Sequence, residues 1–231
     1  MGEIVLLRHG QTEWSLDGRH TGRTDLPLTR EGERQARATA ALLAGSKISA
    51  AWSSPAERAR STAQLAGLPL QGTDPDLWEW DYGGYEGVTT QDIQRGRLGW
   101  NLWTDGVIPG EPGRFPGESV AHVGERCDRV IRRVRPLVAP DSEAALDGDV
   151  ALVAHGHVLR VLVARWLGLP PADGALFLLD TASVSRLGFE HGRPVVTLWN
   201  LVSENPVPGS QTTANQTPNT ASASAPDKTP S

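Results

Sequence analysis

Short apolar runs alternate with helical segments along this sequence, and that alternation restricts the fold more than any other feature. The predicted strands are 4–7, 48–52, 68–71, 150–154, 184–189 and 195–199, the last two forming a hairpin. The first of them is a continuous apolar run, which is typical of a strand buried on both faces of a sheet. Strands that alternate with helices predict an α/β fold, here a three-layer α/β/α sandwich with a mainly parallel central sheet.

Capping residues mark where the helices begin. The predicted helices are 30–43, 55–66, 120–138 and 158–167, with a short one near residue 90 in the otherwise loop-rich stretch 74–118. Thr29 and Ser119 are the expected caps of the first and third. Ser54-Pro-Ala-Glu57 has the form of a capping box with proline at the first helical position, which predicts that Ser54 caps the second.

One domain is predicted over residues 1–204, a length sufficient for a single substantial core. Residues 205–231 hold one aliphatic side chain larger than alanine and no aromatic one. Such a segment does not bury enough apolar surface to offset the entropy lost on ordering. We therefore predict a disordered tail rich in Pro, Ser, Thr, Ala and Asn.

Charge and cysteine content exclude several classes of protein. The net charge of -5 argues against a nucleic-acid partner. Cys127 is the only cysteine, which excludes an internal disulfide and a multi-cysteine zinc site. No apolar run approaches membrane-spanning length, and no signal peptide is recognised. We expect a cytoplasmic protein with a small-molecule partner; the sequence leaves a homodimer open.

Histidines follow two of the predicted strands. Arg8-His9-Gly10 comes after the first strand, and His155-Gly156-His157 comes after the strand at 150–154. Ligands of open α/β sheets bind just beyond the carboxyl ends of strands. A single histidine there is more often a hydrogen-bonded loop residue. Two histidines with an adjacent arginine instead predict one shared pocket.

In these motifs the sequence resembles the histidine phosphatase superfamily, also called phosphoglycerate mutase-like, over about residues 3–200. The resemblance rests on Leu7-Arg-His-Gly-Gln-Thr-Glu-Trp14, Thr21-Gly22, Leu28-Thr-x-x-Gly32, Ser53-Ser-Pro-x-x-Arg-Ala-x-x-Thr62, Leu77-x-Glu79, Gly84-Tyr-Glu-Gly87, Gly117-Glu-Ser119 and His155-Gly156. Eight blocks in the family's order are specific, whereas an isolated Arg-His-Gly is weak. Ser15 departs from the asparagine that many members have, which puts one minor phosphate contact in doubt.

The resemblance implies a phosphohistidine mechanism. His9 would be the nucleophile, and a ring that is neutral near pH 7 has the lone pair this requires. Arg8, Arg58 and His155 would surround the phosphoryl oxygens with fixed donors, without a metal ion or other cofactor. The residues expected to bind phosphate or substrate are Arg8, Thr12, Ser15, Thr21, Gly22, Arg58, His155 and Gly156. From its motif spacing alone, Arg58 is equally well explained as a surface arginine.

Glu79 aligns with the family's acid/base glutamate. Its neighbours Trp78 and Trp80 are expected to desolvate it and favour the protonated form that a general acid needs. Asp81 is the local competitor, and we favour Glu79 on the alignment. Glu86 is expected to be structural.

The rest of the substrate has several candidate contacts. They are His20, Arg23, Trp100, Asn101, Trp103, Arg114, His157 and Arg160. Arg114, on the insertion at 88–117, and Arg160 are expected at the pocket, where either would meet a second anionic group. The tryptophans have a competing explanation as anchors of the insertion to the core. His155 and His157 also form a possible metal-ligand pair, which lacks an obvious third ligand.

Within the family the same pocket supports hydrolysis or a mutase reaction. Glu79-Trp-Asp-Tyr-Gly-Gly-Tyr-Glu-Gly87 and Trp100-Asn-Leu-Trp-Thr-Asp-Gly106 look closer to the fungal sedoheptulose-1,7-bisphosphatases and a mycobacterial acid phosphatase group. We therefore expect a phosphomonoester hydrolase for a small phosphorylated metabolite, a sugar phosphate or bisphosphate. A 2,3-bisphosphoglycerate-dependent phosphoglycerate mutase is the alternative. A non-catalytic binding protein is remote, since the nucleophile, arginines, second histidine and acid are all present.

Overall fold

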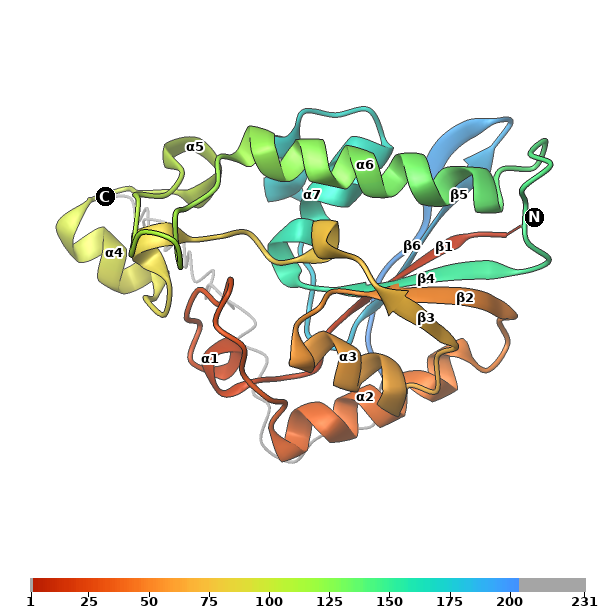
Figure 1. Cartoon of the computed structure of the whole chain (residues 1–231), viewed down its shortest axis with the longest axis horizontal. Helices are drawn as coiled ribbons and strands as arrows, with labels where there is room; N and C mark the ends of the chain where they lie inside the picture. Colours follow the sequence, from red (N-terminus) through yellow and green to blue (C-terminus); the bar gives the residue numbers. More distant parts are fainter. Residues whose placement is uncertain (1, 204–231) are drawn as a thin grey trace, which may run out of the picture.

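A six-stranded sheet forms the centre of the computed structural model, which describes residues 2–203 (Figure 1). The strands are β1 (Ile4–Arg8), β2 (Ile48–Ser53), β3 (Leu70–Thr73), β4 (Asp149–Ala154), β5 (Val184–Glu190) and β6 (Arg193–Leu201). Their order across the sheet is β3-β2-β4-β1-β5-β6. The first four run parallel, and β5 pairs antiparallel with β1 and with β6. The mainly parallel sheet predicted from the sequence is confirmed.

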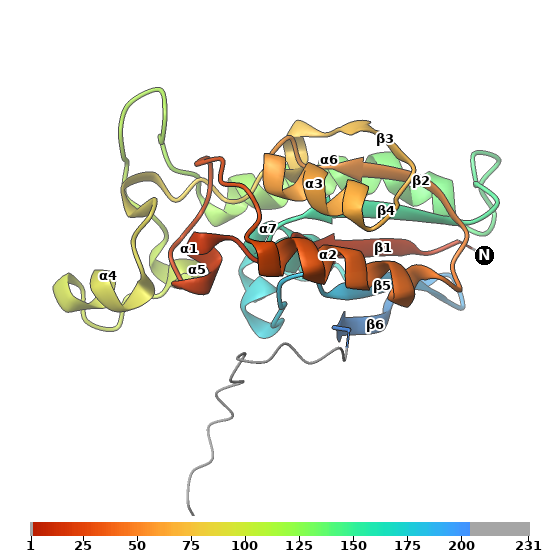
Figure 2. The same cartoon turned by 90° about the horizontal axis from the view of Figure 1, so that it is seen from below.

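Helices cover both faces of the sheet. They are α1 (Glu13–Leu16), α2 (Arg30–Leu43), α3 (Glu57–Leu65), α4 (Thr90–Gly96), α5 (Leu102–Asp105), α6 (Val120–Val138) and α7 (Gly156–Trp166), with 3-10 turns η1 (Pro75–Leu77), η2 (Gly83–Tyr85) and η3 (Pro171–Leu176). In Figures 1 and 2, α2 and α3 lie on one face and α6 and α7 on the other, while α1, α4 and α5 lie beyond one end of the sheet. The three-layer sandwich is therefore also confirmed.

Strand β1 is buried on both faces, as its apolar character predicted. Successive side chains of a strand point to opposite faces. Ile4 and Leu6 accordingly belong to the core under α6 and α7, whereas Val5 and Leu7 belong to the core under α2 and α3. All four are fully buried.

The predicted caps differ in outcome. The Thr29 and Ser119 side chains accept hydrogen bonds from the backbone N–H groups of Gly32 and His122, as expected. The capping box at Ser54 is wrong: α3 begins at Glu57, and its cap position, Ala56, makes no side-chain hydrogen bond. The Ser54 hydroxyl accepts from the Ala56 N–H, outside the helix, and contacts the imidazole of His155.

Other differences are small. The short helices α1 and α5 were not predicted, and β3 begins at Leu70, two residues after its predicted start. The predicted tail, residues 205–231, lies outside the described residues. Within the part of the chain that is described, no helix has the length and apolar character needed to cross a membrane.

Candidate active site

The two strand-end histidines lie together because β1 and β4 are parallel neighbours. Arg8 is in register with Ala154, so the next residues, His9 and His155, leave the same edge of the sheet side by side. Their rings pack edge to face with centroids 5.1 Å apart. The carboxyl edge of the sheet therefore brings both histidines to one place, as predicted.

His9 has the tautomer that a nucleophile needs. Its Nδ1 lies 2.7 Å from the Gly10 carbonyl oxygen. Because a carbonyl only accepts, Nδ1 carries the hydrogen and Nε2 carries the free lone pair. Burial, and then the positive charges of Arg58 and Arg8, lower the pKa of His9 well below its usual value. The ring is therefore neutral and nucleophilic at neutral and mildly acidic pH.

Gly10 holds this loop against the start of α2. A Cβ at Gly10 would lie 2.3 Å from the Gly32 carbonyl oxygen, a distance that only glycine avoids. The Gly10 N–H donates to the Thr62 hydroxyl on α3. His9 therefore precedes a turn that is packed against two helices.

His155 is buried and held from both sides. Its Nδ1 accepts a 3.2 Å hydrogen bond from Arg58 Nε, and its Nε2 lies 2.7 Å from the Ser54 hydroxyl. Burial, and then the charge of Arg58, lower the pKa of His155 well below its usual value. A neutral ring with Nε2–H donating to Ser54 fits both contacts. His155 therefore packs against His9 as a rigid, uncharged ring.

Arg58 lies behind His155, in the first turn of α3, and is not a surface arginine. It is fully buried, and its guanidinium donates to the carbonyls of Thr21, Gly22 and Thr24 as well as to His155. The arginine therefore ties the 21–24 loop to the site. The N–H groups of Arg58 donate to protein acceptors, but its positive charge still lowers the pKa of His9.

Arg8, in contrast, has free hydrogen-bonding capacity. Its Nη1 donates to the Leu179 carbonyl, while its Nε is buried with no partner among the described residues. Even a Cβ at Gly156 would come no nearer to Arg8 Cζ than 3.4 Å, an ordinary contact distance. An unpaired, partly buried cation next to His9 is suited to bind a phosphate.

The Glu79 carboxylate, 4% exposed, lies at the N-terminus of α7. It accepts hydrogen bonds from the backbone N–H groups of Trp80, His157 and Val158. Trp78 stacks parallel to His155, and the Trp80 indole N–H donates to the Glu118 carbonyl, so neither indole hydrogen-bonds to Glu79. Backbone donors, not indole rings, hold this carboxylate.

Glu79 rather than Asp81 reaches the pocket described next. The Asp81 carboxylate turns away and accepts from the Gly83 N–H. Glu86, as expected, is structural: its carboxylate accepts from the N–H groups of Gly22 and Thr24.

A cavity of about 260 Å³ opens beside His9. It is lined by Arg8, His9, Ser15, Gly18, Arg19, His20, Thr21, Glu79, Tyr82, Thr90, Gly156, His157, Arg160 and Leu179. The structure thus brings half of the sequence-predicted residues to one pocket. Gly18, Arg19, Tyr82, Thr90 and Leu179 were missed. The position of Tyr82, three residues after Glu79, could have indicated its place in the pocket. Leu179 contributes a backbone carbonyl, which side-chain motifs do not reveal.

Nine predicted residues do not line this cavity: Thr12, Gly22, Arg23, Arg58, Trp100, Asn101, Trp103, Arg114 and His155. His155 and Arg58 lie behind it, and Thr12 caps α1. The Gly22 N–H is engaged by Glu86. Trp100 is core, with its indole N–H donating to the Gly106 carbonyl, and it packs edge-on against His20.

Arg114 is the clearest correction. Its side chain is 66% exposed, pairs with Glu111 at 3.5 Å, and lies over the Phe115 ring. The local i,i+3 ion pair and the aromatic face keep the guanidinium on its own loop. The predicted second-anion role at the pocket therefore rests on Arg160 alone.

Arg160 lies one turn after His157 on α7. Its Nε and Nη2 donate to the Gly174 and Ala175 carbonyls, and its guanidinium lies over the Trp103 ring at 4.7 Å. No carboxylate pairs with it among the ion pairs of the described residues. A held, unpaired cation at the pocket wall is available to a second anionic group.

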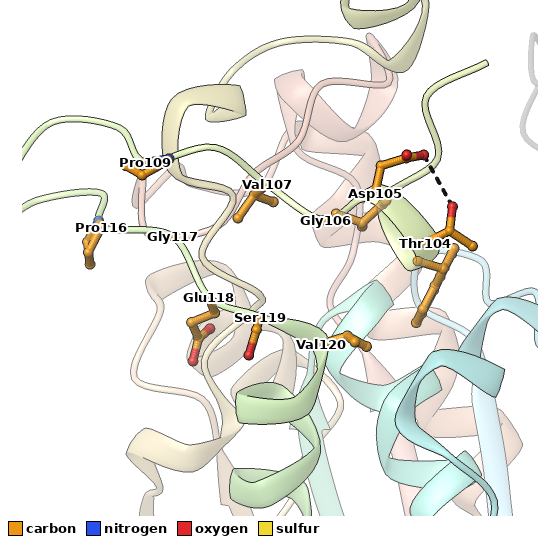
Figure 3. Close-up of a pocket in the computed structure, with 12 residues that line it drawn as sticks. Thr104, Asp105, Gly106, Val107, Pro109, Pro116, Gly117, Glu118, Ser119 and Val120 are labelled. Atoms are coloured by element: carbon orange, nitrogen blue, oxygen red, sulfur yellow. Dashed lines mark hydrogen bonds between the residues drawn. The ribbon is translucent and has the colours of Figure 1, made fainter. Parts of the chain in front are cut away.

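A larger cavity, of about 430 Å³, lies between α5, the 106–109 segment and the start of α6 (Figure 3). Its carboxylates are already paired: Asp105 accepts from Thr104 and from the Asn101 N–H, and Glu118 pairs with Arg126. Neither strand-end histidine lines it. We therefore place the site at the smaller cavity.

The ring nitrogens argue against the metal-ligand alternative for His155 and His157. Both nitrogens of His155 have protein partners, and His157 Nδ1 lies 2.7 Å from the Tyr82 hydroxyl. Between residues 2 and 203, no group of three or more His, Cys, Asp or Glu side chains is arranged to hold a metal ion.

Comparison with known proteins finds a family and several relatives. Residues 4–202 match the Histidine phosphatase superfamily (branch 1). The chain is 41% identical over 191 residues to an acid phosphatase of Mycobacterium tuberculosis, covering 82% of this chain and 87% of that protein. It is 36% identical over 189 residues to the sedoheptulose 1,7-bisphosphatase of Saccharomyces cerevisiae, covering 71% and 67%. A solved structure of a Mycobacterium tuberculosis open reading frame superimposes with a TM-score of 0.77 at 38% identity, covering 87% of this chain and 98% of that one.

Proposed function

Because this chain belongs to branch 1 of the histidine phosphatase superfamily, we propose that it hydrolyses phosphomonoesters through a phosphohistidine at His9. The observation that carries the proposal is the free lone pair of His9 Nε2 in a pocket that also presents Arg8 and Glu79. Relatives named as phosphatases support the hydrolytic outcome.

In the first step His9 Nε2 attacks phosphorus. A nitrogen–phosphorus bond forms as the ester oxygen–phosphorus bond breaks, and the leaving oxygen takes a proton from protonated Glu79. Arg8 donates to the phosphoryl oxygens, where negative charge is spread in the transition state. Arg58 and His155 support this geometry from behind His9.

In the second step a water molecule attacks the phosphohistidine. The Glu79 carboxylate takes a proton from the water, the nitrogen–phosphorus bond breaks, and inorganic phosphate leaves. The three backbone N–H groups that hold the carboxylate suit its ionised form, which this step requires. His9 returns to its neutral tautomer.

The substrate we propose is a small phosphorylated sugar or sugar bisphosphate. A cavity of about 260 Å³ is below the usual range of ligand pockets, which is near 300–1,000 Å³, and suits a small metabolite. Arg160 supplies a second cation away from Arg8. One relative is named for a sugar bisphosphate, which supports the same class.

A phosphate-release assay on phosphoglycerates, sugar phosphates and sugar bisphosphates tests the function. We expect release of inorganic phosphate from one of the sugar classes. Interconversion of 2- and 3-phosphoglycerate that outpaces phosphate release would favour the mutase alternative instead. No turnover on any member of the panel would favour a binding protein.

Arg160→Ala should weaken the enzyme selectively toward bisphosphates. Loss of one charged hydrogen bond is expected to lower kcat/KM on a sugar bisphosphate about ten- to a hundredfold, with a much smaller change on p-nitrophenyl phosphate. Arg114→Ala is the matched control, because Arg114 lies outside the pocket. An equal loss on both substrates for Arg160→Ala would contradict a second-anion site.

Activity should not depend on a metal ion. We propose that cationic Arg8 and the N–H groups around the pocket stabilise the transferring phosphoryl group in the place of a metal. Prolonged dialysis against EDTA is expected to leave kcat unchanged, and vanadate should inhibit competitively. A stoichiometric metal whose removal abolishes turnover and whose return restores it would refute this.

A further inference from the structure

One wall of the pocket is built from neutral polar rings whose role the phosphoryl chemistry does not explain. The Tyr82 hydroxyl, on a side chain that is 2% exposed, lies 2.7 Å from His157 Nδ1. His20 stacks on the Tyr82 ring, with centroids 4.8 Å apart and planes 26° from parallel. All three residues line the cavity beside His9.

The direction of the Tyr82–His157 hydrogen bond determines what the wall presents. Burial raises the pKa of Tyr82 well above its usual value, and burial, followed by Arg160 and His20, lowers the pKa of His157 well below its usual value. Both groups are therefore neutral near pH 7. The Tyr82 hydroxyl has no other hydrogen-bond partner among the described residues, so its hydrogen is donated to Nδ1 and the hydrogen of His157 lies on Nε2. Tyr82 thus selects an N–H donor at Nε2.

His20 keeps this wall uncharged. Burial lowers the pKa of His20 to about 4, and its Nε2 is buried without a hydrogen-bond partner among the described residues. The ring is held between Tyr82 and the edge of Trp100. An anionic group gains no charge pairing from this wall, whereas a hydroxyl or carbonyl oxygen suits a neutral N–H donor.

Arg8, Arg160 and Arg19, which pairs with Asp17, also line this cavity. His157 lies on α7 directly after Gly156, another lining residue, and one turn before Arg160. We infer that Tyr82, His157 and His20 form a subsite for the neutral hydroxyl or carbonyl oxygens of the leaving group, so that the substrate class is phosphorylated polyols. His157 makes the contact through Nε2–H, and Tyr82 is a positioning residue. This inference rests on the proposed phosphatase function.

Two matched substrates test the inference without a second phosphate. Glycerol 2-phosphate and isopropyl phosphate have the same branched ester and differ in two hydroxyl groups. Intrinsic differences in leaving-group reactivity are the same for every variant. The readout is therefore the change in the ratio of the two kcat/KM values, in which any effect common to both substrates cancels.

His157→Phe keeps a ring but removes the donor, and we expect the preference for glycerol 2-phosphate to fall about three- to tenfold, the scale of one neutral hydrogen bond. Tyr82→Phe should lower it about twofold, because an unpinned neutral imidazole divides between two tautomers. His122→Phe, an identical change at an exposed site on α6, should leave the ratio as it is. A His157→Phe ratio equal to that of the unaltered enzyme would overturn the inference.

Nitrogen NMR gives a second readout that a merely structural role would not move. In the unaltered protein the His157 ring should show a protonated Nε2 and an unprotonated Nδ1, and Tyr82→Phe should average the two signals. The signals are assigned by their loss in His157→Phe. A His157 ring protonated on Nδ1 would also overturn the inference. If both esters are hydrolysed with an unchanged ratio, only the subsite fails; if neither is hydrolysed and no phosphohistidine forms with any substrate, the proposed function fails.

Discussion

His9→Ala should form no covalent phosphoenzyme and should lower kcat by several orders of magnitude, the scale seen when a covalent nucleophile is lost. The reason is that Nε2 of His9 carries the free lone pair next to Arg8, whereas both nitrogens of His155 have protein partners. Rapid quenching with a phosphorus-labelled substrate, followed by acid and base treatment, measures the intermediate. A phosphohistidine is stable in base and labile in acid.

The matched control is His122→Ala, which removes an exposed imidazole from α6 and should keep both label and rate. Thermal unfolding of His9→Ala separates loss of the nucleophile from loss of the fold. Label that persists in His9→Ala would move the nucleophile elsewhere, with His155 the first residue to examine. Full turnover in that variant would end the phosphohistidine mechanism altogether.

The strand-end histidines could be predicted from the sequence because their positions follow from elementary rules. An apolar run predicts a buried strand, and parallel neighbours end at one edge, so His9 and His155 meet. Thr29 and Ser119 were equally predictable, since each cap depends on residues within one turn. Local and nearest-neighbour physics therefore accounts for the frame of the site.

Tertiary competition accounts for what sequence reasoning got wrong. Ser54 has a capping-box sequence, but its hydroxyl contacts His155, 101 residues away, and accepts from the Ala56 N–H ahead of the helix. Loop carbonyls and His155 accept from the N–H groups of Arg58, whose expected contact with the phosphate stays a prediction. Arg114 is held by Glu111 on its own loop. In each case a polar group has several possible partners, and only the folded chain decides among them.

Glu79→Gln should lower kcat on alkyl phosphates by about 10²–10⁴-fold, the contribution typical of a positioned general acid or base. On p-nitrophenyl phosphate the loss in the first step should be much smaller, because nitrophenolate leaves without a proton. A burst of nitrophenolate followed by slow turnover is then expected, since the second step still needs a base to deprotonate water. Stopped-flow absorbance measures the burst.

Asp81→Asn is the control for Glu79→Gln, because it makes the same carboxylate-to-amide change two residues away and outside the pocket. We expect it to change kcat by less than about threefold. Glutamine at 79 also turns an N–H group toward one of the backbone donors of α7, which costs about 1–3 kcal/mol for an unsatisfied buried donor and should lower Tm. The loss of stability and the loss of the general acid can be separated. Reduced stability lowers the rate on both substrates alike. Loss of the general acid slows phosphoenzyme formation from alkyl esters but not from the aryl ester. Equal losses in the rate of phosphoenzyme formation on the alkyl and aryl esters would leave Glu79 only a structural role through its contacts to α7. The proton for the leaving oxygen would then have to come from another group in the pocket.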